Sequence, residues 1–317
     1  MRKILFILTI ATLLYSCGRR SNAVQEEDPK GYSSLYDQGN TSACWIYAMC
    51  ACIEHEQLRT GDSVTLSRQW LLARGMEEHT QRLYSMRKQG YDIVSPTRDP
   101  RMGFTMRGVG PEAIRLINEY GLVPYSHEKT HVSNDNATIR RLSAIVGSAA
   151  NQQQLEEQMS EQLPQFTVSR HTYGNQSPSF YYYSMRYTPQ QFAESIMYHQ
   201  QWQFYASEEQ HPWGCQFALE TPDNYRYHQY TNLPMDSIAS MVVASLTEGH
   251  AVYWEYGKRG RTSDHAMAII GIRKGNDGKP RLLCLNSYGK QWGNGGKCLV
   301  SLDFFMRHTS NVGMVKE

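Results

Sequence analysis

One cysteine, placed where a predicted helix begins, strongly limits the folds open to this chain. The residues before Cys44 are small and polar, and those after it form an apolar run. Trp45, Ala48 and Cys52 recur at steps of three and four residues, which predicts a helix that is buried on one side. Ser42 is a suitable N-cap residue, so Cys44 is expected in the first turn of this helix.

A thiol at the start of a helix is suited to nucleophilic chemistry. The unpaired N–H groups and the helix dipole stabilise a thiolate relative to a thiol. Gln38, six residues before Cys44, offers an amide N–H that can converge with the Cys44 backbone N–H. Two donors beside a nucleophile form an oxyanion hole. The alternative is that Cys44 is one of several small hydrophobic residues on a core helix, which is the commoner situation for a lone cysteine.

A base and a residue to orient it occur much later in the chain. His265 begins an apolar run that continues to Ile270, and Asn286 ends the apolar run at 282–285. A neutral imidazole between a thiol and an amide carbonyl can accept the thiol proton and keep one ring orientation. Taken singly, both residues are more simply structural. Taken with Gln38 and Cys44, they indicate a catalytic site.

These residues resemble the papain-like cysteine peptidases, and within them the branch of bleomycin hydrolase and aminopeptidase C. The resemblance covers most of residues 36–126 and 186–306 and rests on Gln38, Cys44-Trp45, Asp264-His265-Ala266-Met267, Asn286-Ser287 and Trp292-Gly293. It implies an α+β, papain-like two-lobe fold. A helical lobe carries the cysteine, and an antiparallel, barrel-like β lobe carries the histidine and the asparagine.

The resemblance also implies peptide hydrolysis through a thioester. In this mechanism His265 removes the proton of Cys44, Asn286 fixes the imidazole ring, and Gln38 donates to the oxyanion. Papain-like enzymes pair their cysteine with a histidine and lower its pKa strongly, so a lowered pKa is implied for Cys44. The substrate is then a peptide or a protein, and neither a metal nor a cofactor is implied.

Three further residues are implied to surround the substrate. Gly108 falls where the family has a glycine loop that binds the extended substrate backbone, although Arg107 replaces a second glycine. A turn residue that needs positive φ is an equal alternative for Gly108. Asp264 is implied to shape the pocket for the side chain two residues before the cut, or is simply polar at a strand end. Trp292 is implied to shield the hydrogen bond between the histidine and the asparagine.

The chain differs from the branch at its C-terminus. Bleomycin hydrolase-like enzymes have a C-terminal arm that enters the cleft and restricts them to removing N-terminal residues, and they form hexamers. Here only residues 304–317 follow the last predicted strand, at 297–302. We therefore expect an open cleft and an endopeptidase or broad peptidase, and we do not expect the hexamer. The alternatives are an aminopeptidase, an acyl transferase and a catalytically silent peptide-binding module, and the complete Gln, Cys, His and Asn set disfavours the last of these.

The N-terminal segment predicts export. A basic start and an apolar run at residues 4–14 are typical of a signal peptide and too short to span a membrane. Leu14-Tyr15-Ser16-Cys17 resembles a lipobox, after which Cys17 would carry lipid, although an ordinary secretory signal with a chance cysteine is the alternative. We expect a bacterial lipoprotein, exported and anchored to a membrane through Cys17, with residues 18–35 as a tether.

The remaining segments are assigned from periodicity and turn residues. Residues 36–126 are expected to form the helical lobe, 127–185 an insertion, and 186–317 the β lobe. Predicted helices lie at 66–84, 112–120, 152–163 and 234–246, and predicted strands at 251–256, 265–272, 282–286 and 297–302. The strands are short and separated by turns, which indicates a small barrel or a curled sheet.

Charge and cysteine content exclude some functions and leave one question open. The net charge of +2 includes no long block of like charge, so no nucleic-acid partner is expected. His127 and His131 have helical metal-ligand spacing, but no further ligand accompanies them. Cys284 and Cys298 can pair across neighbouring strands, or both can be buried thiols.

Overall fold

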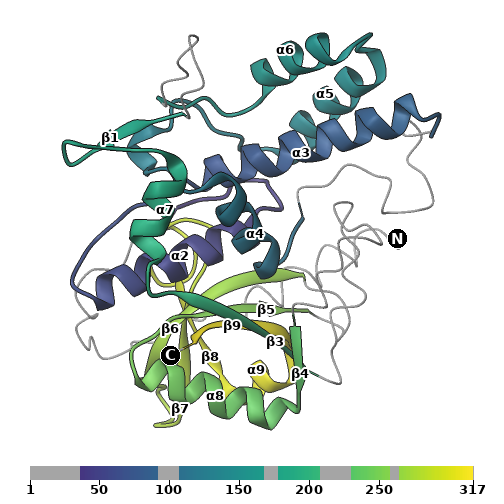
Figure 1. Ribbon diagram of the computed structural model, residues 1–317. Coiled ribbons are helices and arrows are strands. Elements are labelled where there is room, and N and C mark those ends of the chain that lie inside the picture. Colours follow the sequence, from purple (N-terminus) through teal and green to yellow (C-terminus); the bar gives the residue numbers. More distant parts are fainter. Residues whose placement is uncertain (1–35, 92–106, 168–177, 208–229, 258–263, 317) are drawn as a thin grey trace, which may run out of the picture.

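The computed structural model describes residues 36–91, 107–167, 178–207, 230–257 and 264–316. Within these ranges, helices form one lobe and a curled β-sheet forms the other (Figure 1). The helices are α2 (Cys44–Arg59), α3 (Arg68–Lys88), α4 (Gly110–Tyr120), η1 (Tyr125–His127), α5 (Asp135–Ser148), α6 (Gln152–Gln162), α7 (Pro189–Met197), α8 (Met235–Thr247) and α9 (Leu302–His308). Of the described helices, none combines the length and the apolar character that crossing a membrane requires.

The central helix, α2, differs from its prediction in two ways. The consecutive residues from Trp45 to Cys50 are all buried, because α2 lies between the other helices and the sheet. A helix that is apolar all round is typical of such a position. The N-cap is Ala43 and not Ser42, and no side chain caps the helix. The expectation of a helix buried on one side and capped by Ser42 was therefore wrong.

The predicted helices of the helical lobe are confirmed. Ser67 caps α3, since its Oγ accepts a hydrogen bond from the Trp70 N–H at 3.0 Å. Gly121 ends α4 with φ of 70°, a conformation that glycine adopts at little cost. Two helices from the insertion, α5 and the predicted glutamine-rich α6, pack on α3 around a small core that includes Leu83 and Leu155.

A short hairpin leads from the insertion to α7. Strands β1 (Phe180–Tyr182) and β2 (Met185–Tyr187) pair antiparallel, and aromatic side chains of both strands contact Phe192 on α7. Helix α7 lies beside α4, with the Leu122 N–H donating to the Pro189 carbonyl at 2.9 Å. Residues 189–197 therefore lie with the helices, although the predicted boundary placed everything from residue 186 in the β lobe.

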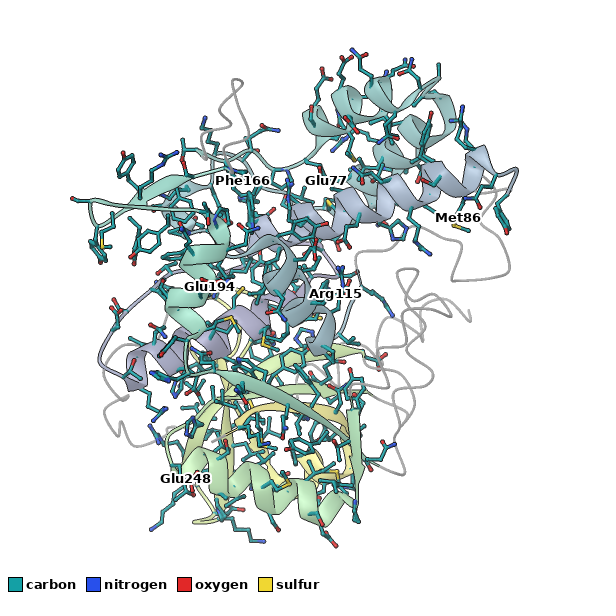
Figure 2. All side chains as sticks on the ribbon, viewed as in Figure 1. Glu77, Met86, Arg115, Phe166, Glu194 and Glu248 are labelled. Atoms are coloured by element: carbon teal, nitrogen blue, oxygen red, sulfur yellow. The ribbon has the colours of Figure 1, made fainter. Side chains whose placement is uncertain are left out.

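The β lobe is built on a sheet of seven strands. Its strands are β3 (Gln201–Ser207), β4 (Tyr230–Leu233), β5 (Val252–Tyr256), β6 (His265–Lys274), β7 (Pro280–Leu285), β8 (Lys297–Ser301) and β9 (Thr309–Lys316). Their order is β4-β3-β9-β5-β6-β7-β8, and every pair is antiparallel except β3 with β4. The four predicted strands correspond to β5 to β8. Helices α8 and α9 pack on one face around Trp254 and Phe305, and Figure 2 shows side chains filling this face and the space between the lobes.

The position of β9 corrects the prediction for the C-terminus. Residues 309–316 form a central strand between β3 and β5, whereas the sequence suggested a short tail after the last strand. Asn311 and Gly313 in this segment are residue types that are common in turns, so they argued against a strand. Gly313 is needed for packing instead, because a Cβ atom there would lie 2.5 Å from the Phe204 ring. Asn311 is buried and bonds to Glu255.

Candidate active site

The start of α2 faces the start of β6 across a pocket between the two lobes. The pocket has a volume of about 120 Å³. Its lining comprises Gln38, Thr41, Ser42, Cys44, Trp45, Arg107, Gly108, Glu255, Asp264, His265, Ala266 and Tyr288. The fold therefore brings a predicted nucleophile and a predicted oxyanion donor together with a predicted base that lies more than 200 positions later in the sequence.

Cys44 is the first residue of α2 and lies next to the strand that carries the histidine. Burial raises the pKa of the Cys44 thiol to about 12, and the nearby Glu255 carboxylate adds to this. The backbone N–H groups of Ala266, the residue after His265, and of Trp45 lower the pKa of the thiol, but by less than burial raises it. The expectation of a lowered pKa for Cys44 in the free protein is therefore wrong, because burial between the lobes outweighs the helix terminus.

His265 is held in one orientation by its neighbours. Its Nε2 lies 2.8 Å from Oδ1 of Asn286, so Nε2 carries the proton and Nδ1 is the acceptor that remains for the thiol. The Tyr288 ring stacks on the imidazole at 5.0 Å and 10°. Burial lowers the pKa of His265, and the bond to Asn286 opposes this. Cys44 and His265 are therefore both neutral at pH 7.

Asn286 follows directly after β7 and is itself held firmly. Its Oδ1 also accepts a hydrogen bond from the Ser287 N–H at 2.7 Å. Its own backbone N–H donates to the Gly296 carbonyl at 2.9 Å. These contacts assign the amide oxygen, and not the amide nitrogen, to the histidine.

Gln38 is connected to the other lobe through Ser287. The Ser287 hydroxyl donates to Oε1 of Gln38, and the Gln38 N–H donates to the Ser287 carbonyl at 2.8 Å. One N–H of the Gln38 amide donates to the Thr41 carbonyl, which leaves its second N–H for the pocket that Gln38 lines. Ser287 was not predicted as a site residue. The sequence feature that could have indicated its role was its position, a hydroxyl residue directly after the asparagine predicted to orient His265.

Gly108 lies in the pocket wall, and its requirement for glycine is steric. It is absent from the described glycines with positive φ, so the alternative of a strained turn is wrong. A Cβ atom at this position would lie 2.5 Å from the Trp45 ring. Arg107 and Asp264, both exposed, line the same pocket.

Trp292 is separated from His265 by the ring of Tyr288. It packs on Tyr288 at 6.1 Å, and it does not line the pocket. Tyr288 is the ring that covers His265. The covering role implied for Trp292 is thus held by Tyr288, with Trp292 supporting it.

Comparison with known proteins concerns the fold of the chain. No protein-family model and no curated protein matches the chain. The crystal structure of PepW from Lactobacillus rhamnosis matches over 98% of this chain and 88% of that chain, with a TM-score of 0.60 and 16% identity. The ragweed Amb a 11 cysteine protease matches with a TM-score of 0.43 and 11% identity, over 90% of this chain and 62% of that chain. The bromelain protease of Ananas comosus matches with a TM-score of 0.41 and 12% identity, over 90% of this chain and 94% of that chain. The last two scores are too low to carry an argument.

The chain has a papain-like fold. This confirms the predicted α+β class and the two lobes. The roles predicted for individual residues remain predictions, because likeness at this identity establishes the fold and not the chemistry.

The papain-like fold of this chain contains a buried carboxylate that the sequence analysis missed. Glu255 on β5 is 1% exposed and lies under the pocket. It accepts hydrogen bonds from the Tyr253 hydroxyl, from the Gly110 N–H at 3.0 Å and from Nδ2 of Asn311 at 3.0 Å. It thus holds the N-terminus of α4 next to Gly108. The available signal was a single acidic residue in an otherwise apolar predicted strand.

Two further features of the sequence are the histidine pair at 127 and 131, for which no metal site was predicted, and the predicted lipidation site. The described residues contain no group of three side chains suited to a metal ion. His127 instead contacts the Tyr181 carbonyl at 3.1 Å and the Thr167 hydroxyl at 3.1 Å. Cys17, the predicted lipidation site, lies outside the described residues.

Proposed function

We propose that this protein is a cysteine peptidase that cleaves peptide bonds through a thioester on Cys44. One observation carries the proposal. Cys44 and His265 line one pocket, and His265 is bonded to Asn286 through Nε2, which leaves Nδ1 for the thiol. A thiol, a base and a residue that orients the base are the parts required for nucleophilic acyl transfer.

Because both partners are neutral at rest, proton transfer accompanies the attack. Nδ1 of His265 takes the thiol proton as the Cys44 sulfur attacks the substrate carbonyl. The Cys44 N–H, which has no partner within the helix, and the second N–H of Gln38 stabilise the oxyanion. The imidazolium protonates the leaving amine, and water then hydrolyses the thioester with His265 again acting as the base.

The course of β9 supports an endopeptidase. Met314 pairs with Val252, whereas His265 pairs with Tyr256 at the opposite end of β5. The described chain therefore leaves β9 at the end of the sheet away from the pocket. A strand that leads the chain away from the pocket is compatible with a substrate that continues on both sides of the cut. Aminopeptidase activity would require some other group to close the cleft.

The proposed location is outside the cytosol. The basic and apolar residues 1–14 followed by the lipobox-like residues 14–17 support export and a lipid anchor on Cys17. The substrates are then peptides or proteins available at a bacterial membrane surface or in the periplasm.

The proposal is tested with a mixed peptide library under reducing conditions, reading the cleavage sites by mass spectrometry. Wild type is compared with Cys44→Ala, and Cys52→Ala serves as the control because it removes a different cysteine of the same helix. We expect internal cuts by wild type and by Cys52→Ala and none by Cys44→Ala.

The other outcomes separate the alternatives. Stepwise loss from peptide N-termini would identify an aminopeptidase. Transfer of the acyl group to an added amine, with no free acid formed, would identify a transferase. Peptide binding without cleavage by a folded wild type would leave a binding module and refute the enzyme.

A further inference from the structure

Two cysteines of the β lobe face each other across neighbouring strands. Cys284 on β7 and Cys298 on β8 are direct partners in the antiparallel register, and both are present as thiols. They belong to the same apolar core and are 0% and 6% exposed. Directly opposed residues of an antiparallel pair have their side chains on the same face of the sheet.

The spacing of the two strands permits a bond between these thiols. Asn286 and Gly296 form a hydrogen-bonded pair, since the Asn286 N–H donates to the Gly296 carbonyl. In an antiparallel ladder, hydrogen-bonded pairs alternate with non-hydrogen-bonded pairs. Cys284 and Cys298 lie two positions further along the two strands, so they also form a hydrogen-bonded pair. The Cα atoms of such a pair are about 5.5 Å apart, within the range that disulfides span. Their Cβ atoms are farther apart than a relaxed disulfide prefers, so the bond would carry strain and be reduced readily.

The other two buried cysteines of the described chain do not have this geometry. Cys50 and Cys52 are two residues apart on α2. Residues at that spacing point to different sides of a helix. They provide a matched control for any effect of oxidation.

We propose that Cys284 and Cys298 form a disulfide when the protein meets a disulfide oxidant such as glutathione disulfide. A thiolate of one cysteine attacks the oxidant, which releases one glutathione thiol and leaves a mixed disulfide. The second cysteine then displaces the second glutathione. The sulfur–sulfur bond of the oxidant is broken, the protein bond is formed, and the two thiol protons end on two glutathione molecules.

The oxidant reaches the buried pair through β8. This strand ends the sheet order and pairs only with β7 among the described strands. Edge strands open locally at lower free energy than the core of a domain. Export to an oxidising compartment would provide the oxidant, although the bond itself does not depend on where the protein resides.

The bond would close the loop that carries part of the candidate site. Residues 285–297 lie between the two cysteines and include Asn286, Ser287, Tyr288 and Trp292. Asn286 is only two residues from the bond. The disulfide therefore restrains the segment that orients His265 and Gln38.

Peptide mapping of the full-length wild type tests the proposal directly. The protein is equilibrated with mixtures of reduced and oxidised glutathione, quenched with acid, alkylated and digested with trypsin without reduction. Cleavage after Arg281, Lys290, Lys297 and Arg307 places the cysteines on different peptides. We expect peptides 282–290 and 298–307 to be linked, two hydrogen atoms lighter than their sum, and separated again by excess reduced glutathione.

Thermal unfolding provides the second measurement. Closing a loop of this length should raise the Tm of the oxidised wild type by roughly 2–6 °C. Cys298→Ala should lose the response to oxidant, and Cys52→Ala should keep it. If Cys298→Ala does not fold, the response of Cys284→Ala to oxidant and the peptide map of the wild type still test whether the disulfide forms.

Three results would overturn the proposal. In the first, both peptides carry alkylated thiols at every glutathione ratio. In the second, Cys284 or Cys298 is linked to Cys17 or Cys215 instead. In the third, Cys298→Ala still responds to oxidant as the wild type does. None of these measurements uses peptidase activity, so failure of the proposed function would not affect them.

Discussion

Oδ1 of Asn286 lies 2.8 Å from Nε2 of His265, and this one contact determines which imidazole nitrogen is available to Cys44. The asparagine oxygen can only accept, so Nε2 donates and Nδ1 is left as the base. The Ser287 N–H bonds to the same oxygen at 2.7 Å and prevents the amide from rotating. The contact therefore fixes both the tautomer and the plane of the ring.

Removing this contact should weaken catalysis without removing the nucleophile. Asn286→Ala leaves a buried imidazole N–H without its acceptor, which costs about 1–3 kcal/mol. We expect kcat/KM for peptide cleavage to fall roughly 10- to 100-fold, as measured by initial rates. Asn151→Ala, which removes only the N-cap of α6, is the control and should retain full activity. Equal loss in both variants would contradict the orienting role.

Activity should survive to a lower pH than free histidine would permit. Burial lowers the pKa of His265 below its ordinary 6.5, so the neutral base persists as the pH falls through 6.5. We expect the acid limb of the kcat/KM profile to have its midpoint below pH 6.5. A midpoint at or above 6.5 would show that His265 is not buried as described.

The same pKa shift should affect folding stability. Below pH 6.5 the unfolded chain binds a proton at this histidine more readily than the folded chain does, so the free energy of unfolding falls with falling pH. Urea unfolding across pH 5–8 measures this slope. His265→Gln should reduce it, because the substitution removes the titrating group.

Gln38 should stabilise the transition state and not the thiol. Gln38→Ala removes one oxyanion donor, for which losses of about 10²- to 10³-fold in kcat are typical. Alkylation of Cys44 by iodoacetamide forms no oxyanion, so its rate should stay close to that of the wild type. Loss of both rates together would indicate that the substitution has disturbed the pocket as a whole.

Gly108 should not tolerate even one added methyl group. In Gly108→Ala the new Cβ atom would lie 2.5 Å from the Trp45 ring, next to the nucleophile. Overpacking of this kind costs about 1–3 kcal/mol, and peptide cleavage should fall as Trp45 moves. Gly147→Ala is the matched control, since a Cβ atom there has no neighbour within 4 Å and α5 should become slightly more stable. Thermal unfolding and peptide cleavage together distinguish the two variants.

Local sequence determined the elements that carry the chemistry. The thiol at the start of a helix, the histidine at the start of a strand and the asparagine at the end of the next strand all follow from periodicity and turn residues. The papain-like fold was implied by the resemblance of these residues to a known family, and the structure confirms it. The export signal and Cys17 remain predictions from sequence, since they lie outside the described residues.

Tertiary structure decided what these elements do to one another. Only the packing of two lobes around α2 buries His265 and leaves Cys44 half-buried, and the loss of solvent around the thiol reverses the pKa expected from its helix terminus. Only strand pairing places residues 309–316 in the middle of the sheet and Glu255 under the pocket. Periodicity reports which side of an element is apolar, whereas burial, strand order and hydrogen bonds between distant residues depend on contacts across hundreds of positions. The local sequence pattern therefore does not predict those contacts.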